Sequence, residues 1–236
     1  MLDLNFEVKG AKPERFAAAP LLRFRLRIGE AVSDGAAATS VQAIVLYCQI
    51  RIEPARRQYS AMEKERLEEL FGSTERWGQT VRPMFWTHAS AVVKPFSGST
   101  EEDLPVPCSY DFTLAATRYF DALDQGELPL GFYFNGTIFY ESAHGGLQVA
   151  QVPWDREAYF RLPVSTWKEL TEAYYPNTAW LCLRKDVFDQ LDGYRSRQGL
   201  ASVEQTLETL LAEKGETGGA ATHRLASWSE RETDIG

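Results

Sequence analysis

The chain has 236 residues, of which 44% are hydrophobic, 12% aromatic and 25% charged. This length and composition suit one or two globular domains and exclude collagen, a coiled coil and a wholly disordered chain. The formal net charge of −8 argues against a general nucleic-acid binder. No apolar run is long enough for a membrane helix, and the acidic N-terminal residues are unlike a signal peptide. We therefore expect a cytoplasmic protein without membrane association.

The N-terminal part has the two-residue period of half-buried strands. Apolar and polar residues alternate over 2–9 and 22–28, and Ile44, Cys48 and Ile52 share one face of a third strand. Arg23, Arg25 and Arg27 project from the polar face of the second strand. We expect Asp3 and Glu7 on the first strand to pair with this row, because opposite charges commonly face each other across strands. The same patterns predict further strands near 84–93, 103–112, 130–140, 147–152 and 157–162.

Helices are predicted by their start and stop signals. Ser60 and Glu63 form a capping-box pattern before a helix that Gly72 closes. A short amphipathic helix is expected over 114–123. The pattern changes at Pro163. Beyond it we predict a helix over 163–175, a short strand over 179–184, and helices over 185–198 and 202–215.

These elements do not alternate as they would in a doubly wound fold, so the predicted class is α+β. We expect a mostly antiparallel sheet or sandwich with helical insertions, followed by a helical C-terminal module. The predicted parts are a β-rich body over 1–162, the C-terminal module over 163–214 and a disordered tail over 215–236.

The cysteines and histidines show no metal-binding spacing. Cys48, Cys108 and Cys182 lie outside any CxxC pair, which is typical of reduced thiols. A metal site would require Cys48, Cys108 and His88 to converge. Cys48 falls on the apolar face of its strand, which favours a buried small hydrophobe over a ligand. We therefore predict no metal and no cofactor.

No catalytic motif is present. GxSxG, Walker and GxGxxG sequences are absent, and His144 and His223 lie in a glycine turn and in the predicted tail. The prediction is a protein that is not an enzyme, although an enzyme with an unrecognised site stays open.

A basic and aromatic group in loops and at strand ends is the predicted surface for a protein partner. Loops carry function more often than core elements do, and Trp, Tyr and Arg are enriched at interfaces. The predicted binding residues are Arg51, Arg56, Arg57, Tyr59, Trp77, Trp154 and Arg156.

Several long phrases carry a family resemblance. QIRIEPARRQYS, ELFGSTERWGQTVRP and QVPWDREAYFRLPVSTWKEL, with the stretch from Phe85 to Phe112, resemble a bacterial family of unknown function over residues 1–212. The resemblance implies genes located beside those for NiFe hydrogenases and their maturation factors. It therefore implies an accessory protein in hydrogenase assembly, by association and not by chemistry.

A second resemblance provides an alternative function. Residues 179–213 are similar to a ribbon–helix–helix unit, which would dimerise through its strand and read DNA in a transcriptional regulator. Trp180, Cys182 and Arg184 would then be the reading side chains. Only one of them is basic, so nucleic-acid binding is not the expected function.

The burial of the C-terminal module separates these alternatives. If the module packs on the body, Leu181 and Leu183 should be buried within the same chain, and Trp167 and Tyr174 should help to cover the body. We predict that the module packs on the body in this way. The sequence leaves open an oligomer formed through the C-terminal module.

Overall fold

The computed structural model describes residues 3–30, 39–108, 114–142, 145–178, 181 and 183–215. These residues belong to two compact units, 1–178 and 179–236. The fold is α+β with antiparallel sheets and C-terminal helices, as predicted. Predictions for the tail after 215, for His144 and His223, and for Trp180 and Cys182 lie outside the described residues.

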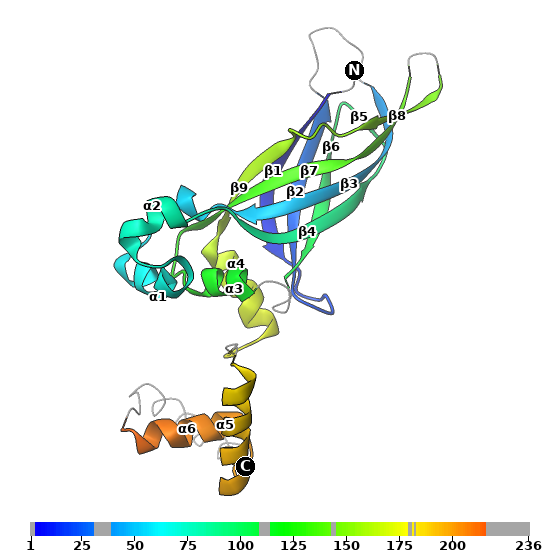
Figure 1. Cartoon of the computed structure of the whole chain (residues 1–236). Coiled ribbons are helices and arrows are strands. Elements are labelled where there is room, and N and C mark those ends of the chain that lie inside the picture. Colours follow the sequence, from blue (N-terminus) through cyan, green and yellow to red (C-terminus); the bar gives the residue numbers. More distant parts are fainter. Residues whose placement is uncertain are drawn as a thin grey trace, which may run out of the picture. The chain divides into compact units, whose positions relative to one another are not determined.

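The first sheet contains three antiparallel strands in the order β1-β2-β6 (Figure 1). Their bounds are Leu4–Pro13 for β1, Leu21–Glu30 for β2 and Ser99–Pro107 for β6. Alternation of buried and exposed positions along β1 and β2 confirms the two predicted N-terminal strands. The predicted internal pairing of the arginine row has different partners: Arg25 pairs with Asp103 at 2.6 Å, and Arg23 pairs with Glu14. Asp3 pairs with Arg156 instead, and Glu7 lies opposite Arg27 in the register of β1 and β2 but forms its ion pair with Lys9. The acids that pair with Arg25 come from β6, on the other side of β2.

The second sheet contains six strands. β4, β3, β7 and β8 are hydrogen-bonded in that order, while β5 pairs with β3 and β9 pairs with β7. Every pairing is antiparallel. The bounds are Ser40–Ile52 for β3, Met84–Val93 for β4, Phe96–Ser97 for β5, Glu127–Glu141 for β7, Leu147–Gln151 for β8 and Glu157–Pro163 for β9.

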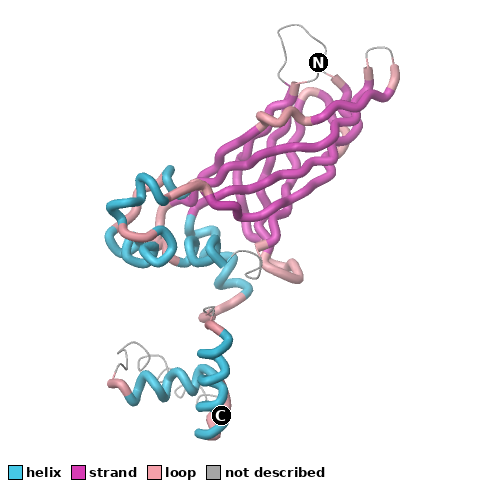
Figure 2. The backbone as a smooth tube through the Cα atoms, viewed as in Figure 1, coloured by secondary structure: helices cyan, strands magenta, loops and turns pink. Residues whose placement is uncertain are grey.

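The strands of the two sheets lie together in one β-rich body (Figure 2). Their inward side chains belong to one hydrophobic core. Phe6 of the first sheet stacks on Phe134 of the second with ring centroids 4.7 Å apart. Phe24 contacts Phe132 edge to face at 5.1 Å. Burial of such apolar surface contributes about 25 cal/mol per Å², so the inward faces of both sheets supply the main stabilisation of this unit.

Short helices gather at one end of the strands (Figure 1). The Ser60 side chain accepts a hydrogen bond from the Glu63 N–H, and the Glu63 side chain accepts one from the Ser60 N–H, which confirms the predicted capping box. The helical segments are η1 (Pro54–Arg56), α1 (Ala61–Phe71), η2 (Thr74–Arg76), α2 (Trp77–Thr80), α3 (Leu114–Asp121) and α4 (Val164–Tyr174).

Helix α4 packs on the β-rich body. Trp167 is buried, and its ring lies 4.5 Å from that of Phe120 on α3. The Tyr174 hydroxyl donates a hydrogen bond to the Glu14 carbonyl at 2.7 Å. The predicted role of Trp167 and Tyr174 in covering the body is confirmed. The compact units therefore divide after Thr178, and α4 belongs to the first of them.

The second unit contains α5 (Lys185–Gln198) and α6 (Val203–Glu213), both close to the predicted helices. In the predicted strand over 179–184, the described residues Leu181, Leu183 and Arg184 belong to no strand. Leu181 is 67% exposed and Leu183 is only partly buried, so the prediction that both are buried is wrong. A strand needs a neighbour to satisfy its backbone groups, and no described strand pairs with this segment. Within the described residues, no helix has the length and apolar character needed to cross a membrane.

Candidate binding site

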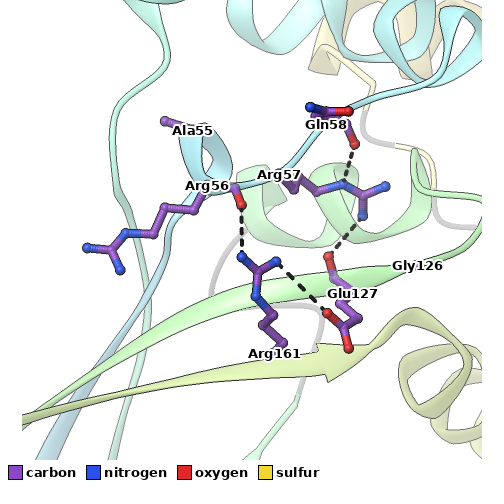
Figure 3. Close-up of a pocket in the computed structure, with 7 residues that line it drawn as sticks. All are labelled: Ala55, Arg56, Arg57, Gln58, Gly126, Glu127 and Arg161. Atoms are coloured by element: carbon purple, nitrogen blue, oxygen red, sulfur yellow. Dashed lines mark hydrogen bonds and ion pairs between the residues drawn. The ribbon is translucent and has the colours of Figure 1, made fainter.

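A pocket of about 710 Å³ opens where η1 and the residues after it meet β7 and β9 (Figure 3). Three of its lining residues are arginines, and they come from two separate parts of the chain. The lining residues are Ala55, Arg56, Arg57, Gln58, Gly126, Glu127 and Arg161. Cationic side chains around an open pocket favour an anionic ligand.

Arg57 forms the rigid wall of this pocket. Its Nη2 lies 2.8 Å from Glu63 Oε1, and the two side chains are only 8% and 4% exposed. Arg57 also donates hydrogen bonds to three backbone carbonyls, those of Gln58, Gln125 and Glu127, each at 3.2 Å. The charge of Arg57 is therefore used within the protein, where it ties the loop after η1 to the start of β7.

Glu63 is the acidic partner of this wall. Burial by itself raises the pKa of the Glu63 carboxyl, but N–H groups of Ser60 and Asp124 and the Arg57 guanidinium outweigh burial and hold the pKa below its ordinary value. Glu63 therefore stays ionised, caps α1 and fixes Arg57 at the same time.

The other two arginines face solvent. The Arg56 guanidinium stacks 4.0 Å above the Tyr159 ring, and its Nε lies 4.0 Å from Glu53 Oε2. Arg161 donates to the Arg56 carbonyl at 3.5 Å, and its Nη1 lies 3.9 Å from Glu127 Oε2. Their side chains are 51% and 57% exposed. These two cations are held in place mainly by stacking and long contacts, which leaves donor edges available to a ligand.

A second stack lies beside the first on the same sheet. The Arg51 guanidinium lies 4.7 Å from the Tyr133 ring centroid. Gly131 pairs with Arg51 on one side and with Tyr159 on the other. A Cβ at Gly131 would lie 3.2 Å from the Tyr133 hydroxyl and 3.3 Å from Glu53 Oε1, so the absent side chain lets these groups approach. We define the arginine–tyrosine surface as Arg51, Arg56, Tyr133, Tyr159 and Arg161.

Tyr133 connects this surface to a buried carboxylate. Its hydroxyl donates to Glu53 Oε1 at 3.2 Å, and only 7% of Glu53 is exposed. Burial raises the pKa of Tyr133 above its ordinary value, and hydrogen bonding with Tyr159 and the nearby Glu53 raises it further. The phenol therefore remains protonated and acts as a donor.

Two of the predicted binding residues, Tyr59 and Trp77, contact the loop around η1 on its core side. The Tyr59 hydroxyl donates to the Pro54 carbonyl at 2.7 Å and lies 2.8 Å from the Tyr119 hydroxyl. Burial raises the pKa of Tyr59 to about 12. Trp77 packs edge to face on Tyr59 at 5.3 Å, and its indole N–H donates to the Gly72 carbonyl. Both rings are partly buried against the core, so they support the pocket from outside its lining.

The last two predicted residues lie in the turn between β8 and β9, outside the pocket lining. Trp154 is 92% exposed. Arg156 pairs with Asp3 at 2.7 Å. Of the seven predicted residues, the structure thus places Arg56 and Arg57 in the pocket and Arg51 on the adjoining stack. Sequence reasoning missed Tyr133, Tyr159 and Arg161, which β7 and β9 supply through strand register.

The three candidate metal ligands do not converge. Cys48 and Cys108 are free thiols with 1% and 4% exposure. His88 is exposed on β4, where its ring lies 4.8 Å from that of Phe85. In the described part of the chain, no three His, Cys, Asp or Glu side chains gather as a metal site would require.

This architecture defines an α+β protein with two antiparallel sheets and an arginine-lined pocket. A family model, described as a family of unknown function (DUF6084), matches residues 1–219, and the chain belongs to this family. No curated protein and no solved structure matches the chain.

Proposed function

We propose that the chain is a non-catalytic accessory protein of the cytoplasm that binds an acidic segment of a protein partner on the arginine–tyrosine surface. The observation that carries this proposal is the pair of stacked arginines, Arg51 on Tyr133 and Arg56 on Tyr159. Arg161 adds a third guanidinium beside Arg56, and its side chain is 57% exposed.

Stacking orients a guanidinium for recognition of a carboxylate. The aromatic ring covers one face of the planar group, while its N–H edge remains available for two parallel hydrogen bonds. Tyr and Arg are also the residue types that most often dominate binding energy at protein interfaces. A protein of net charge −8 repels a polyanion such as nucleic acid, whereas a short acidic segment meets only the local positive field.

Assembly of NiFe hydrogenase is the process in which we propose that this partner acts. The support is the gene neighbourhood that the family resemblance implies. The partner would then be a hydrogenase subunit or a maturation factor, recognised through clustered Asp or Glu side chains.

The test is affinity purification of the tagged chain from its native cell, followed by mass spectrometry of bound proteins and metals. The wild type is compared with Arg56→Gln/Arg161→Gln and with a matched control, Arg76→Gln/Arg82→Gln. Arg76 and Arg82 are exposed and lie outside the pocket lining. We expect one protein to be recovered with the wild type and the control, and about 10-fold less of it with the pocket variant. Equal recovery with all three chains would contradict the proposal.

A defined probe tests the chemistry separately. A fluorescent oligoglutamate peptide should bind the wild type more tightly than the pocket variant, and its affinity should fall as salt screens the arginines. Binding that is insensitive to both the substitutions and salt would contradict recognition of an acidic segment.

A further inference from the structure

Each arginine of the pocket lining has an acidic partner within 4.0 Å. In the described part of the chain, these ion pairs are Arg57–Glu63, Arg56–Glu53 and Arg161–Glu127. The formal charges of the six side chains therefore cancel. An anionic ligand gains little from a pocket whose charges are balanced, unless it takes the place of one of these acids.

Two of the three acids, Glu63 and Glu53, are fixed in the protein. The Glu63 side chain is 4% exposed and accepts hydrogen bonds from the N–H groups of Ser60 and Asp124. Glu53 is 7% exposed and accepts a hydrogen bond from the Tyr133 hydroxyl. Moving either carboxylate would leave a donor without its partner, which is costly at a buried position. A ligand therefore cannot readily replace these two acids.

The carboxylate of Glu127, by contrast, can swing into solvent. Its side chain is 52% exposed, and Oε2 lies 3.9 Å from Arg161 Nη1, which is too long for a hydrogen bond (Figure 3). The backbone is fixed at this point. The Glu127 carbonyl accepts a hydrogen bond from Arg57 at 3.2 Å, and the Gly126 carbonyl accepts one from the Val164 N–H at 2.9 Å. Only the side chain of Glu127 has to move when a ligand takes its place.

We infer that Glu127 competes with the acidic ligand for Arg161, so that binding exchanges one carboxylate for another. This inference rests on the proposed function. A ligand carboxylate gains hydrogen bonds of ordinary length to the Arg161 guanidinium, in exchange for the long contact with Glu127. The displaced Glu127 carboxylate stays beside the ligand and repels it. Glu127 therefore makes Arg161 a weaker anchor for an acidic segment than an unpaired arginine would be.

The experiment measures binding of the fluorescent oligoglutamate peptide to the full chain at low salt, by fluorescence anisotropy. The test variant is Glu127→Gln, which removes the competing charge and keeps the size of the side chain. The matched control is Glu65→Gln, which removes the same charge from an exposed position of α1 outside the pocket lining. Both substitutions are repeated in an Arg161→Gln chain, which separates competition for Arg161 from general repulsion.

We expect Glu127→Gln to bind the peptide about threefold more tightly than the wild type, a size typical of the loss of one exposed ion pair. Glu65→Gln should bind it as the wild type does. In the Arg161→Gln chain, the added Glu127→Gln substitution should produce no gain, because the cation for which Glu127 competes is absent.

Two results would overturn this inference and leave the proposed function standing. Peptide binding that depends on Arg161 but is no tighter in Glu127→Gln would show that Glu127 does not compete. A gain of the same size with and without Arg161 would show that Glu127 only repels the ligand from a distance. The inference and the proposed function fail together if the peptide binds neither the wild type nor Glu127→Gln, or if it binds the wild type and the pocket variant equally.

Discussion

Arg57 and Glu63 form a buried ion pair with Nη2 and Oε1 2.8 Å apart, and this pair joins the capping of α1 to the wall of the pocket. Glu63 serves both as the N3 residue of the capping box and as the anchor of Arg57. The loop that presents Arg56 is therefore held by the start of the helix that follows it. The geometry of the pocket depends on a residue outside its lining.

Loss of one partner of this pair should be costly. Arg57→Met leaves the Glu63 carboxylate buried without its cation, and we expect the free energy of unfolding to fall by about 3 kcal/mol. The double variant Arg57→Met/Glu63→Met should lose less than the single variants together, because neither charge is then left alone. Equilibrium unfolding in urea gives the free energy of unfolding of the wild type, Arg57→Met, Glu63→Met and the double variant. Additive losses would contradict the coupling.

Acid should weaken the fold through Glu63. The pKa of Glu63 in the folded chain is lowered from its ordinary value of 4.5, so the unfolded chain takes up the proton at higher pH. The stabilisation is therefore fully present above the unfolded pKa and is lost as pH falls through the folded pKa. Glu63→Gln should flatten the decline in urea midpoint below about pH 4.5, whereas Glu65→Gln, exposed on the same helix, should not. Parallel curves for both variants and the wild type would contradict this assignment.

The strands could be predicted from the sequence, but not their neighbours. Half-buried strands such as β2 alternate apolar and polar residues, and this local signal depends on no other part of the chain. Pairing of β2 with β6, and of β3 with β7, joins residues far apart in the sequence. For that reason the sequence alone pairs Arg25 with acids on β1, whereas its partner Asp103 lies on β6.

The same limit applies to the candidate site. Arg56 and Arg57 were found because they are adjacent in a loop rich in basic and aromatic residues. In the sequence, Tyr159 and Arg161 have the pattern of ordinary strand residues. Only the register between β7 and β9 brings them to the arginine–tyrosine surface. In the segment 179–184, alternation by itself predicted a strand, yet the described residues have no partner strand to complete it.

The two buried thiols should be unreactive in the native protein. Cys48 and Cys108 are 1% and 4% exposed, and burial raises the pKa of each to about 12. Because the thiolate is the nucleophile, neither should be alkylated by iodoacetamide near pH 8 until denaturant is added. Peptide mapping by mass spectrometry distinguishes these two sites from Cys182. Rapid native alkylation at Cys48 or Cys108 would show that the core opens frequently.

The backbone of β3 approaches Gly136 of β7 so closely that this position should tolerate no side chain. Gly136 has φ +149°, and a Cβ there would lie 2.2 Å from the Val45 carbonyl oxygen. Both the unusual backbone conformation and the clash with a fixed strand oppose substitution. We expect Gly136→Ala to lower the free energy of unfolding by about 3 kcal/mol.

The matched control for this change is Gly78→Ala. Gly78 lies in α2, and a Cβ added there would meet no atom within 4 Å, so alanine should change stability by no more than about 1 kcal/mol and in the stabilising direction. Urea midpoints of the two variants provide the comparison. If Gly136→Ala matched the control, the two strands would have to separate at Leu46 without cost, although Leu46 is fully buried and pairs directly with Gly136.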